Sequence, residues 1–162
     1  MRHRLSQGMP RGIGEPVCNE RERHMTLAKV QEMIATGGQP PIGKTLGFRL
    51  VECGDGLAVF EGDPGPETYN PMGTVHGGYA ATLLDSACGI AVVTRLQEGQ
   101  SMTTLELKTS YLRAMTAKTG RVRAEGRVIS SGRRVAYVEA KLTDEAGRLM
   151  ATATSTLLII EG

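Results

Sequence analysis

The sequence predicts an α+β protein in which one long apolar helix is covered by a curved antiparallel sheet of about six strands. Three observations predict it. Residues 75–96 form an apolar stretch long enough for a helix of about six turns. Four later segments alternate apolar and polar residues, as strands with one buried face do. Glycine-containing turns separate consecutive strand segments, which is typical of antiparallel neighbours.

The N-terminal region predicts a tail followed by one short helix. Residues 1–24 are rich in Arg, Gly and Glu and lack apolar periodicity, so we expect a disordered tail ahead of a single domain over 25–162. Met25 is an alternative start of the chain. Apolar residues recur at helical spacing within 25–38, and a glycine pair ends that helix. Residues 39–45, QPPIGKT, predict a loop.

Two strands are expected before the long helix and four after it. Residues 46–53 and 56–62 flank the sequence Gly54-Asp55-Gly56, which is a strong hairpin signal. Residues 63–74 are rich in proline and glycine and predict a loop. The later strand candidates are 102–113, 119–130, 134–143 and 148–160.

The alternation within these strands defines a dry face and a wet face. One set of alternating residues is small or apolar, and most of the residues between them are charged. The dry set comprises Val122, Ala124, Gly126, Val128, Ala136, Val138, Ala140 and Leu142. A sheet with one apolar face needs a cover, and the helix over 75–96 is the only segment long and apolar enough to provide it.

Composition excludes several classes of protein. The 19 basic and 17 acidic residues nearly balance, which argues against a nucleic-acid partner. No apolar stretch could cross a bilayer and no secretory signal is visible, so we expect no membrane partner. The three cysteines are widely separated and predict reduced thiols in a cytoplasmic protein. Histidine occurs only at positions 3, 24 and 76, so we expect no metal site and no cofactor.

The segment NPMGTVHGGYAATLLD, residues 70–85, carries the most distinctive chemistry. The start of a helix presents unpaired backbone N–H groups and the positive end of the helix dipole. Gly77 and Gly78 leave such N–H groups uncovered, so this turn could bind the oxygen of a polarised carbonyl. His76 could hydrogen-bond that carbonyl or orient the turn. From the residues alone, packing or capping roles for the glycines and a structural role for His76 stay open.

Asp85 lies among leucines and alanines of the same helix. An ionised carboxylate is costly to bury without partners, so Asp85 is either bonded to nearby donors or acts as a general base or nucleophile. It follows His76 by nine residues, which places it about half a turn out of phase and about 13 Å further along the axis. One helix cannot bring the two together, whereas two helices related by a two-fold axis can. A site shared between subunits follows if both residues are catalytic.

The same residues resemble a known family. The segment 70–85, the segment TTLELKTSYLRA and the sequence from Gly120 to Ile159 are similar to hotdog-fold acyl-CoA thioesterases of the phenylacetate-degradation (PaaI-like) branch. The resemblance covers roughly residues 40–160. It implies a hotdog fold and hydrolysis of an acyl-CoA thioester to free acid and CoA. It also implies a homodimer as the minimal active unit, within a homotetramer built as a dimer of dimers.

The resemblance implies a role for each residue of the motif. Asn70 would help place the water or the thioester, and His76 would support the carbonyl site. The Gly77 N–H would polarise the thioester oxygen. Asp85 would be the base or nucleophile and would come from the facing subunit. Thr104, at the start of the next strand, would aid water placement.

Further residues are expected to contact the substrate. Thr103 is the neighbouring alternative to Thr104. Basic residues in turns are candidates for the CoA phosphates, because Arg can fork onto a phosphate; these are Arg113, Arg133 and Arg134. For each of these arginines, the alternative interpretation is a solvent-exposed charge in a turn with no ligand. Apolar helix residues are candidates for the acyl tunnel or for plain core; these are Tyr79, Leu83 and Leu84.

Two other functions compete with thioester hydrolysis. Acyl-CoA hydratases share the hotdog fold but usually carry their catalytic histidine in a different motif. A non-catalytic acyl-CoA-binding protein is the second alternative, against which the intact Asp85 argues. Crotonyl-CoA hydration measured against CoA release separates the enzymes, and tight binding without turnover would indicate the binder.

Overall fold

The computed structural model describes residues 25–37 and 39–162, so the tail predicted over 1–24 lies outside the described residues. Its six strands form one antiparallel sheet in the order β1-β2-β4-β5-β6-β3. The strands are β1 (Phe48–Gly54), β2 (Leu57–Gly62), β3 (Ser101–Tyr111), β4 (Val122–Ser131), β5 (Val135–Asp144) and β6 (Leu149–Ile160). The helices are α1 (Leu27–Ala35), α2 (Pro41–Leu46) and α3 (Gly77–Val93), with single 3₁₀ turns at Pro66–Thr68 and Ala117–Thr119.

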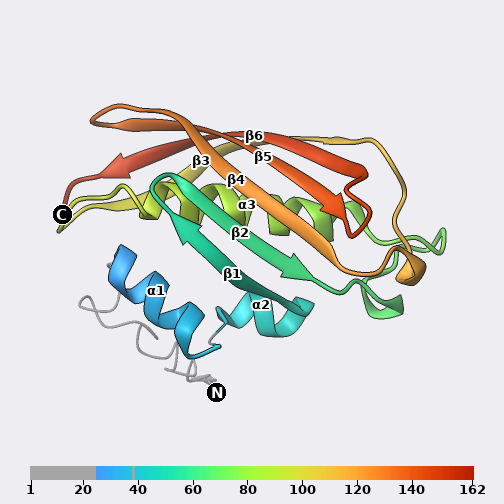
Figure 1. Cartoon of the computed structure of the whole chain (residues 1–162). Helices are drawn as coiled ribbons and strands as arrows, with labels where there is room; N and C mark the ends of the chain where they lie inside the picture. Colours follow the sequence, from blue (N-terminus) through green and yellow to red (C-terminus); the bar gives the residue numbers. More distant parts are fainter. Residues whose placement is uncertain (1–24, 38) are drawn as a thin grey trace, which may run out of the picture.

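The predicted α+β architecture is confirmed. The long helix α3 lies against the curved sheet and contacts each of its strands, while α1 and α2 lie beside β1 (Figure 1). Within the described residues, no helix is both long and apolar enough to span a membrane.

The predicted dry face packs onto α3. Alternate residues of β4 and β5 are buried there together with Leu83 and Leu84, which are fully buried core residues. Gly126 permits the close approach of β4, because a Cβ at this position would lie 2.5 Å from the Ala87 carbonyl oxygen. The helix therefore packs tightly on one face of the sheet, and the opposite face of the helix is not covered by the described residues.

The loop predicted over 39–45 is partly wrong, because Pro41–Leu46 form the short helix α2. Pro41 occupies the first helical position, where its fixed φ is already helical and its missing N–H is not needed. Gly47 ends the helix at a φ of 71°, a left-handed conformation that glycine adopts without strain. The prolines and this glycine are thus start and stop signals around a short helix.

The predicted helix over 75–96 is shorter at both ends. Val75 is extended and bridges to Tyr69, and His76 is the N-cap residue with φ −62° and ψ 135°. At the other end Thr94 is the C-cap, and its hydroxyl accepts a 2.8 Å hydrogen bond from the Gly56 N–H in the β1–β2 turn. His76 therefore stands outside the helix that Gly77 begins.

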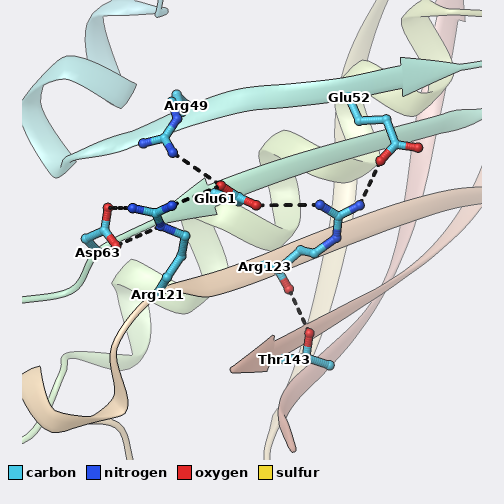
Figure 2. A network of polar contacts seen from close by, with 7 residues as sticks. All are labelled: Arg49, Glu52, Glu61, Asp63, Arg121, Arg123 and Thr143. Atoms are coloured by element: carbon cyan, nitrogen blue, oxygen red, sulfur yellow. Dashed lines mark hydrogen bonds and ion pairs between the residues drawn. The ribbon is translucent and has the colours of Figure 1, made fainter. Parts of the chain in front are cut away.

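Ion pairs connect β1, β2 and β4 on the outer side of the sheet (Figure 2). Glu61 of β2 lies directly opposite Arg49 of β1 and Arg123 of β4, at 3.2 Å and 3.6 Å. Arg123 also contacts Glu52 at 2.7 Å. Opposite charges facing one another across neighbouring strands favour this register.

Candidate active site

The loop that leads into α3 is held from within by Asn70. Its Oδ1 accepts hydrogen bonds from the Met72 and Thr74 N–H groups at 3.0 Å and 3.3 Å, and its Nδ2 donates to Thr74 Oγ1 at 3.0 Å. This side chain therefore shapes the loop six residues before His76. Among the described residues, no hydrogen bond joins Asn70 to Gly77 or Asp85.

His76 caps α3 with its imidazole. Its Nδ1 accepts a 2.9 Å hydrogen bond from the Gly78 N–H. A neutral imidazole that accepts at Nδ1 carries its proton on Nε2, so the exposed side chain keeps an Nε2–H donor. A Cβ at position 78 would lie 2.8 Å from Nδ1. The second glycine of the motif therefore leaves room for the histidine cap.

Gly77 is the first residue of α3. Within the described part of the chain, its N–H has no hydrogen-bond acceptor, as the geometry of a helix start allows. Its carbonyl accepts a 3.0 Å hydrogen bond from the Tyr111 hydroxyl. The sequence analysis missed Tyr111. An aromatic residue near the end of a strand candidate was a signal, but the sequence does not show which group its hydroxyl contacts.

Asp85 meets Thr104 across the α3–β3 contact. Thr104 Oγ1 donates a 3.1 Å hydrogen bond to Asp85 Oδ1, and no other hydrogen bond to Asp85 occurs in the described residues. The carboxylate is partly buried, and its charge adds to the desolvation that raises the pKa of the Cys88 thiol to about 12. The neighbouring Thr103 is exposed. The structure therefore pairs Thr104, the preferred candidate, with the carboxylate.

One chain does not bring the two halves of the motif together. Gly77 and Asp85 are eight residues apart on the same helix, which separates them by about 12 Å along its axis. Residues on the uncovered face of α3 recur every three or four positions and are partly exposed; they include Gly78, Ala81, Thr82, Asp85 and Ser86.

Two hollows flank the start of α3. The first, about 310 Å³, is lined by Gly77, Tyr111 and Arg113 among others. The Arg113 guanidinium also donates a hydrogen bond to the Leu149 carbonyl. The second, about 360 Å³, is lined by residues from both sides of the turn, including Glu67, Thr68, Tyr69, His76, Gly78 and Tyr79.

Tyr79 lies in the wall of the second hollow and is almost fully buried. Burial first, and the charges of Asp63 and Glu67 second, raise the pKa of its phenol to about 12. Its hydroxyl is buried and has no hydrogen-bond partner among the described residues. Tyr79 therefore presents a neutral, mainly apolar surface at neutral pH.

The arginine pair of the β4–β5 turn lies elsewhere. Arg133 and Arg134 line a different hollow of about 550 Å³ beside the end of β6. Along β6, Ala151 pairs with Tyr111 and Leu158 pairs with Val135, and those seven residues of strand span about 23 Å. The structure therefore brings Arg113 to Gly77 and leaves Arg133 and Arg134 distant from it within one chain.

Comparison with known proteins adds independent findings. Residues 72–151 match the family described as the thioesterase superfamily. The chain is 26% identical to 1,4-dihydroxy-2-naphthoyl-CoA hydrolase of Listeria monocytogenes, over 72% of this chain and 93% of that protein. It is 30% identical to a putative esterase of Saccharolobus solfataricus, over 83% of this chain and 92% of the relative.

A solved structure also resembles this chain in both fold and sequence. A mutant of the phenylacetic acid degradation protein PaaI from Thermus thermophilus superposes with a TM-score of 0.67 at 30% identity. The superposition covers 74% of this chain and 98% of that one.

Proposed function

Because the chain belongs to the thioesterase superfamily and has the hotdog fold, we propose that it hydrolyses acyl-CoA thioesters at a site shared by two subunits. The Gly77 N–H holds the developing oxyanion, and Asp85 of the facing subunit activates water or attacks the carbonyl. CoA as the thiol is supported by the name of the Listeria relative, which hydrolyses a CoA thioester.

The observation that carries the proposal is the Thr104–Asp85 hydrogen bond. It fixes a carboxylate on the face of α3 that points away from the sheet, where the described residues give it one donor and leave its other oxygen available. The Gly77 N–H is likewise without an acceptor in the described part of the chain. A second α3 running antiparallel about a two-fold axis closes the separation of about 12 Å between these groups.

The exposed edge of β3 supports a dimer. This strand has 11 residues, none of which is buried in the single chain, and Leu105 on it is 58% exposed. A long edge strand with apolar side chains is a template for pairing with another chain. The outer face of the sheet also exposes Ile129 and Tyr137, which a second dimer would cover in a homotetramer.

In the proposed reaction, the thioester oxygen lies against the Gly77 N–H and the His76 Nε2–H. Asp85, oriented by Thr104, takes a proton from water as the water oxygen attacks the carbonyl carbon. The carbon–sulfur bond then breaks, and the CoA thiolate takes up a proton to leave as the thiol. If Asp85 attacks directly instead, water releases the acid from the resulting anhydride. Both routes yield free acid and CoA.

Arginines are proposed to hold the CoA phosphates. Arg113 adjoins the hollow beside Gly77 and can serve the site that its own chain builds there. Arg133 and Arg134 can reach the same ligand only from another subunit, because strand length separates them from Gly77 by about 20 Å or more.

The test is thiol release from a panel of aryl and straight-chain acyl-CoAs. We expect Asp85→Asn to lower kcat about 100- to 10,000-fold, the range for loss of a general acid–base group. Glu98→Gln, the same change from carboxylate to amide at an exposed position in the loop after α3, serves as the control and should keep the wild-type rate. Wild-type rates from Asp85→Asn would overturn the proposal. So would crotonyl-CoA hydration without CoA release, or tight acyl-CoA binding without turnover.

A further inference from the structure

Three groups form a hydrogen-bonded chain from β3 to the imidazole of His76. The Tyr111 hydroxyl donates to the Gly77 carbonyl at 3.0 Å. That carbonyl belongs to the same peptide unit as the Gly78 N–H, which donates to His76 Nδ1 at 2.9 Å. A phenol on the sheet is thus linked through one peptide group to the ring nitrogen of the residue beside the proposed oxyanion site.

Each glycine of the motif makes room for one end of this chain. A Cβ at Gly77 would lie 3.0 to 3.2 Å from three atoms of the Tyr111 side chain. A Cβ at Gly78 would lie 2.8 Å from His76 Nδ1. The Gly77–Gly78 peptide is therefore closely approached by the phenol on one side and the imidazole on the other.

We propose that Tyr111 is a positioning residue, which holds His76 in the tautomer that leaves Nε2–H free to donate. The effect on turnover rests on the proposed hydrolysis, whereas the effect on the tautomer does not. Donation by the phenol polarises the peptide and makes the Gly78 N–H a stronger donor. The other tautomer would set an Nδ1–H against this N–H, leaving two donors facing each other and neither satisfied.

The position of Tyr111 is fixed by the sheet. It is the last residue of β3 and pairs with Ala151 of β6. The next residue, Leu112, donates its N–H to the Met150 carbonyl at 2.8 Å. The same strand carries Thr104, which orients Asp85. In the shared-site arrangement, each β3 would therefore support the helix start of one site and the carboxylate of the other.

The test compares Tyr111→Phe with Tyr137→Phe. The first variant keeps the ring against Gly77 and removes the hydroxyl. The second removes a hydroxyl from an exposed tyrosine of β5, distant from the turn. The ¹⁵N chemical shifts of the His76 ring report the tautomer directly and are assigned by comparison with His76→Asn. Turnover of the best acyl-CoA gives kcat and KM.

We expect wild type and Tyr137→Phe to show the Nε2–H tautomer. In Tyr111→Phe the Gly78 N–H still faces Nδ1 but is a weaker donor, so the share of the Nε2–H tautomer should fall below that of the wild type. We expect kcat to be lowered about 5- to 10-fold, the effect of one hydrogen bond, with little change in KM. An unchanged tautomer in Tyr111→Phe would overturn the inference. If the wild type hydrolyses no acyl-CoA, the proposed function fails, and the chemical shifts still decide the role of Tyr111.

Discussion

The two ends of α3 differ in how their backbone groups are satisfied. At the C-terminal end, the Thr94 hydroxyl accepts from the buried Gly56 N–H, and Arg95 bonds Asp55 in the β1–β2 turn. At the N-terminal end, Gly77 keeps an N–H without an acceptor in the described residues, and the exposed His76 keeps an Nε2–H donor. The C-terminal end, here called the closed end, is hydrogen-bonded to the β1–β2 turn. The N-terminal end, here called the open end, keeps donors that the described residues do not use.

This difference separates stability from function along a single helix. Contacts at the closed end join α3 to the sheet, so their loss should lower the free energy of unfolding and leave the chemistry intact. The Gly77 N–H at the open end has no acceptor in the described residues. Its removal should therefore lower the rate of the proposed reaction and leave stability almost unchanged.

Among changes at the two ends of α3, Gly77→Pro should have the largest effect. Proline is well accepted at the first position of a helix, and the extended backbone of His76 suits a residue that precedes proline. The change removes the amide N–H, and loss of an oxyanion donor lowers kcat about 100- to 1,000-fold. Gly77→Ala adds the same Cβ against Tyr111 but keeps the N–H, so it should retain far more activity. Equal rates for the two variants would show that the N–H is not used.

Thr94→Val tests the closed end. The substitution keeps the side-chain shape and leaves the buried Gly56 N–H unsatisfied, which costs about 1–3 kcal/mol of unfolding free energy. Urea denaturation measures the loss, and kcat should stay at the wild-type value. A variant of unchanged stability and reduced kcat would reverse the contrast between the two ends.

Thr104→Val removes the donor to Asp85. We expect kcat to fall about 5- to 10-fold, because one hydrogen bond that orients the carboxylate is lost. Thr104→Ser keeps the hydroxyl and should restore most of the rate. Steady-state turnover of the two variants provides the comparison, and a serine variant as slow as the valine variant would argue against the hydroxyl.

Arg95→Ala should have the smallest effect. The partner carboxylate of Asp55 is 82% exposed, and exposed ion pairs contribute less than about 1 kcal/mol. The change should therefore lower the urea midpoint slightly, less so at high salt, with kcat unaffected. A loss as large as that of Thr94→Val would mean that the ion pair, and not the buried hydrogen bond, closes this end.

Pattern and spacing predicted the fold because burial follows them. The alternation in β4 and β5 identified the face that packs on α3, and the apolar stretch identified the helix. Short helices and the boundaries of elements were harder to predict. The existence of α2, for example, depends on Pro41 standing at the first helical position and Gly47 directly after the last.

The candidate site was only partly readable from the sequence. The apolar surroundings of Asp85 identified it as a candidate, and the family resemblance added Thr104. The structure joins the two across 19 residues of sequence. The histidine cap and the Tyr111 contact depend on backbone direction at a turn, which residue spacing does not encode.

The shared site is tested most directly by combining two inactive variants, Gly77→Pro and Asp85→Asn. When their subunits are refolded together, a mixed dimer contains one site with both changes and one with neither. Random pairing should then restore about a quarter of the wild-type activity. Activity that stays at the level of the separate variants, in a sample shown to contain mixed dimers, would contradict a site built from two chains.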